Sequence, residues 1–152
     1  MQKIYIDSNI ILARIYPANG EQEKVSKRII FNLQRYQNYK VVIPQIVLAE
    51  IFSKLLDNKD RDELLLLFDQ LLNIISNTSE CLPNATKNML ELAIDIVNND
   101  NKMDICDATI VAQAILDDAD MLLTFDAGIR ESEYIQKIKK EYNKKLRITD
   151  SL

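Results

Sequence analysis

The stretch Lys3–Leu12, KIYIDSNIIL, places one carboxylate between two apolar runs. Lys3–Ile6 is rich in residues that favour β-strands, and Ser8 or Asn9 is a good N-cap for a helix that begins with the second apolar run. Asp7 therefore marks the carboxyl end of a predicted buried strand. Ligands bind at that edge in open parallel α/β sheets, so Asp7 is a candidate site residue, although a turn or capping role is the simpler explanation of this segment alone.

Helical patterns alternate with short apolar strands along the rest of the chain. Further strands are predicted over residues 40–43, 77–82, 120–125 and 146–149. Helices are predicted over 10–16, 21–38, 44–56, 60–75, 83–97, 104–119 and 129–142. The second helix is expected to face the core with Val25, Ile29, Phe31 and Leu33. This order predicts the α/β class, a three-layer α/β/α sandwich with a central parallel sheet, in a single domain over residues 1–152.

The composition is that of an ordinary globular protein. Of the 152 residues, 47% are hydrophobic and 28% charged, and no apolar run approaches the roughly 20 residues that span a bilayer. The chain enters a strand at once, without the pattern of a signal peptide, so we expect a cytoplasmic protein with no membrane association. Cys81 and Cys106 have no CxxC spacing, and we expect them to be small buried hydrophobes without chemistry.

Two absences exclude several classes of enzyme. The chain has no histidine, which rules out His-based triads and imidazole metal sites. It has only two glycines, Gly20 and Gly128, so it can form neither a P-loop nor a GxGxxG turn. The net charge of −4 argues against a protein that coats DNA, but it allows local basic patches on an acidic body.

Several carboxylates lie in apolar surroundings, where an unpaired charge costs several kcal/mol. Glu50 lies within IVLAEIFSKLL, where its first charged companion is Lys54, so a salt bridge and a site role are equally open. Asp107 shares a helical stripe with core residues and has no cation at local spacing, which favours a site. Asp126 follows the strand MLLTF as Asp7 follows the first strand, and alone it fits a helix cap.

These acids gain significance as a group. Two lie at the carboxyl ends of parallel strands and two on helices that begin nearby, so we expect them to converge at the topological switch point of the sheet. Oxygen ligands without histidine suit Mg²⁺ or Mn²⁺ rather than zinc. Asp104, one turn before Asp107, fits a helix-capping residue.

Four segments, YIDSNIIL, VVIPQIVLAEIF, ICDATIVAQA and LLTFDAGI, occur in an order that resembles the PIN-domain nucleases over nearly the whole chain. The nearest group is the single-domain VapC-like toxins. The family pattern Asp-Ala-x-Ile-x-Ala-x-Ala matches Asp107 to Ala114, with Val111 where alanine is common. The Thr-x-Asp element is present as Thr124 and Asp126, and Asn9 fills the family position for Ser, Thr or Asn. Each motif is weak alone, but their order and spacing are fairly specific.

The resemblance implies an endoribonuclease that uses Mg²⁺ or Mn²⁺. It implies catalytic and metal-binding roles for a set of four acids, namely Asp7, Glu50, Asp107 and Asp126. The family pattern does not settle Asp104, which stays an additional candidate ligand. Asn9 and Thr124 would orient the carboxylates. Basic side chains at the rim would guide the RNA strand, and the candidates are Arg14, Lys54 and Arg130.

The helix that contains LLLLFDQLL is more apolar than one core contact requires. We therefore expect a homodimer or a groove for an antitoxin protein, as in a toxin-antitoxin pair. One alternative is a catalytically inactive PIN fold that serves as an interaction module. A phosphotransferase of the haloacid-dehalogenase type is a weaker alternative, since that chemistry needs a second Asp at the position of Asn9.

Overall fold

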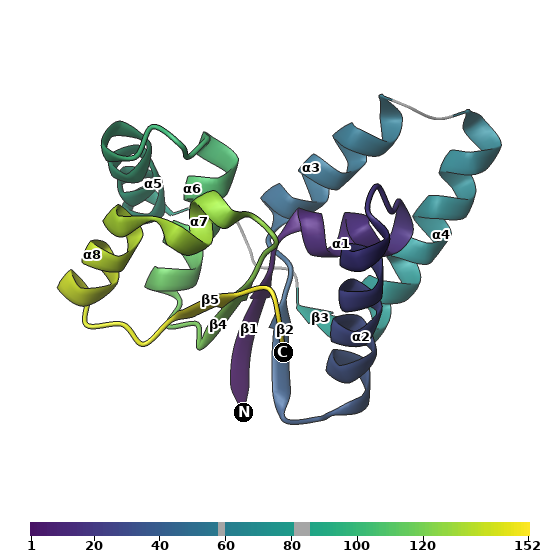
Figure 1. The fold of residues 1–152 in the computed structure, drawn as a ribbon, viewed down its shortest axis with the longest axis horizontal. Helices are drawn as coiled ribbons and strands as arrows, with labels where there is room; N and C mark the ends of the chain where they lie inside the picture. Colours follow the sequence, from purple (N-terminus) through teal and green to yellow (C-terminus); the bar gives the residue numbers. More distant parts are fainter. Residues whose placement is uncertain (58–59, 81–85) are drawn as a thin grey trace.

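The computed structural model describes residues 1–57, 60–80 and 86–152, and within them five strands form one sheet (Figure 1). The strands are β1 (Gln2–Ile6), β2 (Tyr39–Val42), β3 (Ser79–Glu80), β4 (Met121–Leu123) and β5 (Arg147–Thr149). Their order across the sheet is β3-β2-β1-β4-β5, and every neighbouring pair is parallel. The predicted parallel sheet is confirmed.

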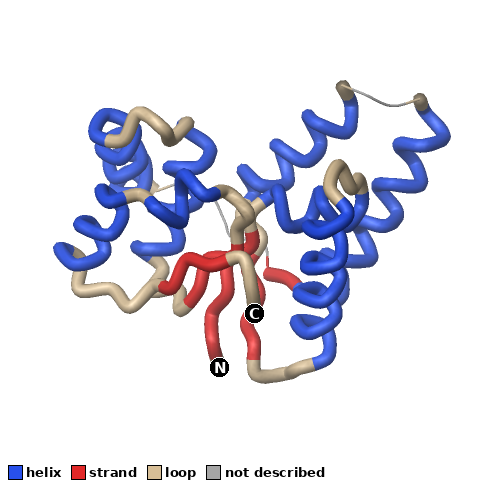
Figure 2. Tube along the Cα trace, in the orientation of Figure 1, coloured by secondary structure: helices blue, strands red, loops and turns tan. Residues whose placement is uncertain are grey.

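Helices cover both faces of the sheet. They are α1 (Ser8–Ile15), α2 (Gly20–Arg35), α3 (Gln45–Leu56), α4 (Arg61–Thr78), α5 (Lys87–Asn99), α6 (Ile105–Leu116), α7 (Ala127–Glu131) and α8 (Glu133–Glu141). In Figures 1 and 2, α1, α2 and α4 lie to one side of the strands, and α5, α6 and α8 to the other. The three-layer sandwich is thus confirmed. Among the described residues, no helix combines the length and apolar character needed to cross a membrane.

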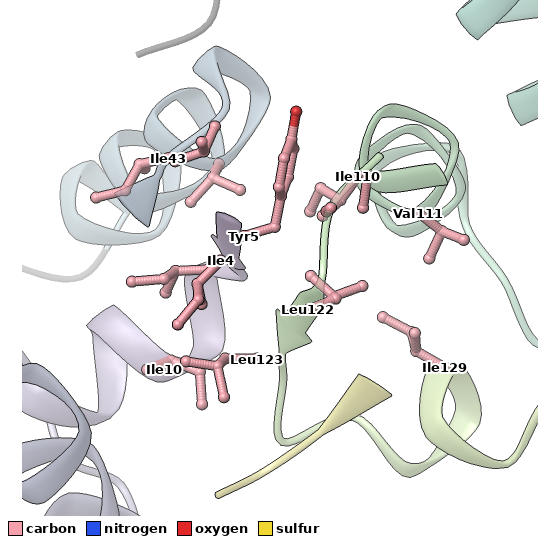
Figure 3. Close-up of a cluster of buried hydrophobic side chains, with 14 of the residues drawn as sticks. Ile4, Tyr5, Ile10, Ile43, Ile110, Val111, Leu122, Leu123 and Ile129 are labelled. Atoms are coloured by element: carbon pink, nitrogen blue, oxygen red, sulfur yellow. The ribbon is translucent and has the colours of Figure 1, made fainter. Parts of the chain in front are cut away.

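The central strand β1 is buried on both faces, which explains its apolar sequence. Alternate side chains of a strand point to opposite faces, and Ile4 and Tyr5 are both fully buried. Figure 3 shows Ile4 on the side of Ile10 from α1, and Tyr5 on the side of Ile110 from α6. The core therefore continues through the sheet and fixes both helices against β1.

The chain changes direction across the sheet beside β1. It runs outward from β1 to β2 and β3, and then returns to place β4 on the other side of β1. The carboxyl ends of β1 and β4 are joined by a hydrogen bond from the Asp7 amide to the Leu123 carbonyl at 3.0 Å. This is the topological switch point, the place where open α/β sheets bind ligands.

Two details of the prediction are wrong. Phe31 is 57% exposed, because the buried stripe of α2 comprises Ser26, Ile29, Ile30 and Leu33, and Phe31 lies about 100° around the helix from Ile30. The single helix predicted over 129–142 is two helices, α7 and α8, separated at Ser132. The Ser132 side chain caps α8 and donates a hydrogen bond to Asp100, which holds the break.

The cysteine predictions have separate outcomes. Cys106 is half-buried and free, rather than fully buried. Cys81 and the predicted helix start at Pro83 lie outside the described residues.

Candidate active site

Asp7 is the buried centre of a hydrogen-bond network at the switch point. Its side chain is 2% exposed, and Oδ1 accepts from the Ser8 amide at 2.6 Å, which caps α1. Oδ2 accepts from Asn9 Nδ2 at 2.6 Å and from the Thr124 hydroxyl at 2.7 Å. Asn9 Oδ1 in turn accepts from the Phe125 amide at 3.0 Å. The caps of α1 and the end of β4 therefore fix the orientation of one carboxylate.

The surroundings of Asp7 disfavour its charged form. Burial raises the pKa of Asp7 to about 6, the Thr124 hydrogen bond opposes that rise, and the nearby negative charge of Glu50 adds to it. The structure therefore brings Glu50 within electrostatic reach of Asp7. A cation beside these two carboxylates would offset this cost.

Asp126 begins the short helix α7 at the end of β4. Its amide donates to Thr124 Oγ1 at 2.9 Å, so the hydroxyl that holds Asp7 also anchors Asp126. Oδ1 of Asp126 accepts from the amides of Gly128 at 2.6 Å and Ile129 at 3.2 Å. The capping role predicted from the sequence is thus confirmed, and it leaves Oδ2 without a hydrogen bond among the described residues.

Asp107 lies in the first turn of α6 with other acids around it. Burial, followed by the negative charges of Asp104, Asp7, Asp126 and Glu50 in that order, together raise the pKa of Asp107 to about 7. Among the described residues, its carboxylate has neither a hydrogen-bond donor nor a cationic partner. The structure thus brings all four predicted acids into one electrostatic group.

Asp104 caps α6, as predicted from the sequence. Its Oδ1 accepts from the Asp107 amide at 2.9 Å. Its charge is the largest of the acidic contributions to the raised pKa of Asp107. The cap therefore orients α6 and also adds negative charge beside the site.

Glu50 divides its two oxygens between different environments. Oε1 forms an ion pair with Lys54, one turn along α3. Oε2 is buried and has no hydrogen-bond partner in the part of the chain that the structure describes. A buried carboxylate oxygen without a donor is costly, and a bound cation would satisfy it.

The predicted basic residues occupy three different positions. Arg14 lines a cavity of about 380 Å³ between α1, α2 and α4, and none of the four acids lines that cavity. Lys54 pairs with Glu50 inside the site. Arg130 on α7 forms an ion pair with Asp150.

Asp150 is a residue that the sequence analysis missed. It follows β5 directly, and β5 runs parallel to β4, so its carboxylate lies along the same edge of the sheet as Asp126. The signal was present in LRITD, where an acid follows an apolar strand, as in KIYID and LLTFD.

The site has the donors that a hard cation requires, although it does not form a finished cage. Among residues 1–57, 60–80 and 86–152, no three acidic or cysteine side chains are arranged so that they could hold a metal ion. The donors are all oxygens, and one of them is Oε2 of Glu50, which has no hydrogen-bond partner among the described residues. The neighbouring carboxylates also raise the pKa of Asp107. Carboxylate oxygens of this kind are the ligands that Mg²⁺ and Mn²⁺ prefer.

The contact between Gly128 and Asp126 gives a test of the site's geometry. A Cβ at Gly128 would lie 2.9 Å from Asp126 Oδ1, so Gly128→Ala must displace that carboxylate. We expect Gly128→Ala to lower the RNA cleavage predicted from the sequence by about 10- to 100-fold, the usual effect of disturbing the support of a metal ligand. The measurement is the initial cleavage rate at matched folded protein.

Gly20→Ala is the matched control, because a Cβ at Gly20 meets no atom within 4 Å. It should leave the cleavage rate unchanged and stabilise α2 by up to about 1 kcal/mol. Equal rates for both alanine variants would show that the position of the Asp126 carboxylate does not matter.

Comparison with known proteins agrees with this fold. VapBC2 of Rickettsia felis, solved with a DNA fragment from its promoter, has a TM-score of 0.63 at 18% identity over 97% of this chain and 98% of that one. VapC20 of Mycobacterium tuberculosis, a toxin that cleaves the sarcin-ricin loop, has a TM-score of 0.62 at 16% identity over 86% and 95%. VapBC-1 of nontypeable Haemophilus influenzae gives 0.62 at 16% identity over 98% of each chain.

Comparison with curated proteins gives no significant match. The family model of the PIN domain matches residues 4–133, which include all four candidate acids. This match covers most of the chain and agrees with the observed sheet order and switch-point site. The chain belongs to the PIN domain family.

Proposed function

We propose that this protein is a Mg²⁺- or Mn²⁺-dependent endoribonuclease whose site is formed by Asp7, Glu50, Asp107 and Asp126. The observation that carries the proposal is the position of these carboxylates at the carboxyl ends of β1 and β4, where Asp7 and Asp126 both bind the Thr124 hydroxyl group and the buried Oε2 of Glu50 has no hydrogen-bond partner among the described residues. Burial and the neighbouring acids raise the pKa of Asp107, so its charged form is costly. Such an arrangement opposes folding, and a bound divalent ion offsets it. Family membership supports a nuclease.

The chain's own residues would prepare the site for in-line attack on a phosphodiester. Asp7, Glu50 and Asp107 would hold the ion, and Asp126 would complete the acidic group. When bound, the ion supplies an activated water and stabilises charge on the leaving oxygen. Asn9 and Thr124 keep Asp7 in one orientation, which reduces the reorganisation needed when the RNA binds.

The substrate proposed is RNA, and the biological role proposed is that of a toxin in a toxin-antitoxin pair. The support is the likeness in fold to VapC20, whose structure is described as that of a toxin that cleaves the sarcin-ricin loop, and to two VapBC proteins. A cytoplasmic location follows from such a substrate.

The cleavage assay tests the reaction itself. The purified protein is incubated with a single-stranded or loop-containing RNA in Mg²⁺, in Mn²⁺ and in EDTA. We expect cleavage with either ion and none with EDTA, because the ion supplies the activated water and offsets the repulsion between the four carboxylates and the phosphate that is cleaved. Cleavage at the same rate in EDTA would exclude the metal mechanism.

A surface formed by α3 and α4 supports a protein partner. Its exposed apolar side chains are Phe52, Leu56, Leu65, Leu66 and Leu72, each 39 to 62% exposed. We propose that the helices between residues 20 and 75 form a homodimer or bind an antitoxin. The same surface favours the second candidate function, an inactive interaction module, and RNA cleavage by the wild type separates the two.

Self-association gives a further prediction. Leu66→Arg places a charge in the exposed surface of α3 and α4 and should shift the purified protein from dimer to monomer in sedimentation velocity. Leu90→Arg on α5 is the matched control, because Leu90 is similarly exposed at 47% but lies on the opposite face of the sheet. A wild type that stays monomeric at high concentration would contradict the dimer.

A further inference from the structure

A cavity of about 320 Å³ adjoins the acidic site on the side of α2 and α7. Its wall includes Phe125, whose amide donates to Asn9, the residue that holds Asp7. Two guanidinium groups line it, Arg28 from α2 and Arg130 from α7. Asn9 therefore links Phe125 in the cavity wall to Asp7 through two hydrogen bonds. The two guanidinium groups share the lining with the carboxylates of Glu21 and Asp150, and they offer donors that suit an anion.

Arg130 is incompletely satisfied in this cavity. Its Nη1 contacts the Asp150 carboxylate, while its Nε is buried and has no hydrogen-bond partner among residues 1–57, 60–80 and 86–152. Arg28 is exposed and forms no ion pair with any described residue. An anion with several oxygens would satisfy the Nε and neutralise both guanidinium groups, which the single contact with Asp150 does not.

We propose that this cavity binds a phosphate group of the RNA strand through Arg130 and Arg28, and that Asp150 competes with that phosphate for Arg130. The inference rests on the proposed function, since it assigns the phosphate to RNA. Asp150 follows β5 at the same edge of the sheet as Asp126. Its carboxylate therefore lies where an RNA strand that extends from the acidic site past Arg130 would pass. At 42% exposed it can turn into solvent when the phosphate enters.

Binding measurements without cleavage test this proposal. A fluorescent single-stranded RNA with a 5′-hydroxyl end is titrated with the full chain in EDTA, and anisotropy gives the Kd. Asp150→Asn should tighten binding by about threefold, because it releases Arg130 from a partly exposed pair. Arg130→Gln should weaken binding by about tenfold and reduce the slope of log Kd against log salt by about 0.7, the value for one phosphate contact on a single strand.

The double variant separates competition from simple charge repulsion. Asp150→Asn should have no effect on RNA binding when Arg130→Gln is already present, because the two residues act through one contact. If Asp150→Asn increases the affinity for RNA equally in the wild type and in Arg130→Gln, the proposal is overturned, because long-range repulsion between Asp150 and the RNA then explains the effect. Arg28→Gln, which leaves the pair between Arg130 and Asp150 intact, should also weaken binding, and no change would remove Arg28 from the site.

Asp118→Asn is the matched control. Asp118 also pairs with a cation, Lys144, but it precedes β4 and so lies at the opposite edge of the sheet. Removing this charge should leave the Kd unchanged. If Asp118→Asn tightens binding as much as Asp150→Asn, net charge explains both results and the proposal fails.

Further outcomes show whether the cavity binds RNA or free phosphate. They also separate failure of this inference from failure of the proposed function. Inorganic phosphate could raise the Tm of the wild type but not that of Arg130→Gln, while both proteins bind RNA equally well. That result would indicate a site for a free anion and would overturn the assignment of the cavity to RNA. A wild type that neither binds RNA in EDTA nor cleaves it in Mg²⁺ or Mn²⁺ would overturn both the proposed function and this inference. A wild type that cleaves RNA in Mg²⁺ but does not bind it in EDTA would overturn this inference alone. If none of the cavity variants changes the Kd for RNA and Asp150→Asn only lowers stability, the inference alone is overturned. The pair between Arg130 and Asp150 then has a structural role.

Discussion

Asp107→Asn is expected to abolish metal-dependent RNA cleavage and, in EDTA, to raise the free energy of unfolding by about 1 kcal/mol. The carboxylate has a pKa raised to about 7 by burial and by the surrounding acids, so its charged form opposes the fold. One pKa unit corresponds to about 1.4 kcal/mol, and the figure is reduced because the side chain is partly exposed and screened by solvent. The cap of α6 survives, because it uses the Asp107 amide rather than the side chain.

Thermal and urea melts with EDTA and with Mg²⁺ provide the measurement, alongside one cleavage assay. Mg²⁺ should stabilise the wild type more than Asp107→Asn, since the intact group binds the ion more tightly. Asp118→Asn serves as the control for loss of one exposed negative charge and should keep full cleavage. A variant at Asp107 that is less stable, still active and equally responsive to Mg²⁺ would remove this residue from the site.

The stability of the metal-free protein should fall as the pH rises from about 4 to about 7. Asp7 and Asp107 have raised pKa values in the folded state, about 6 and about 7, so the folded protein holds these protons where the unfolded chain has released them. Stability then decreases with rising pH, because the unfolded state binds fewer protons in this window. For buried Asp7, the rise from 3.8 to about 6 corresponds to about 3 kcal/mol.

Urea melts across this pH window in EDTA measure the effect. Asp107→Asn should remove the part of the decline that extends to about pH 7 and leave the part due to Asp7, which ends near pH 6. Saturating Mg²⁺ should reverse the trend, because binding requires the ionised carboxylates. A stability that rises steadily with pH in EDTA would show that the two carboxylates are stabilised, rather than strained, in the fold.

The local part of the site was predictable because strand ends and helix caps depend on near neighbours in the sequence. Asp7 and Asp126 follow apolar strands, and Asp104 precedes an apolar helix, so each position could be assigned from a few residues. The parallel order of strands then requires their carboxyl ends to share an edge. The Glu50 pair with Lys54 also has the ordinary i,i+4 spacing of a helical ion pair.

What the sequence could not show depends on contacts between distant segments. The break between α7 and α8 is held by Ser132 and Asp100, which are 32 residues apart. Phe31 is exposed because Ile30, its neighbour in the sequence, lies on the face of α2 that packs inward. The spacing of apolar residues alone does not locate that face to within one residue. The partnership of Arg130 with Asp150 needs β5 to lie beside β4, which only the assembled sheet provides.

The central proposal is that Asp7, Glu50, Asp107 and Asp126 together form a binding site for divalent cations. The most direct measurement is a crystal structure of the wild type grown with Mn²⁺, with anomalous differences collected at the manganese edge. We expect an anomalous peak for a manganese ion that is coordinated by carboxylate oxygens of these four residues, including Oε2 of Glu50. An anomalous map without a peak at this edge of the sheet, in crystals with saturating Mn²⁺ and all four side chains ordered, would contradict it.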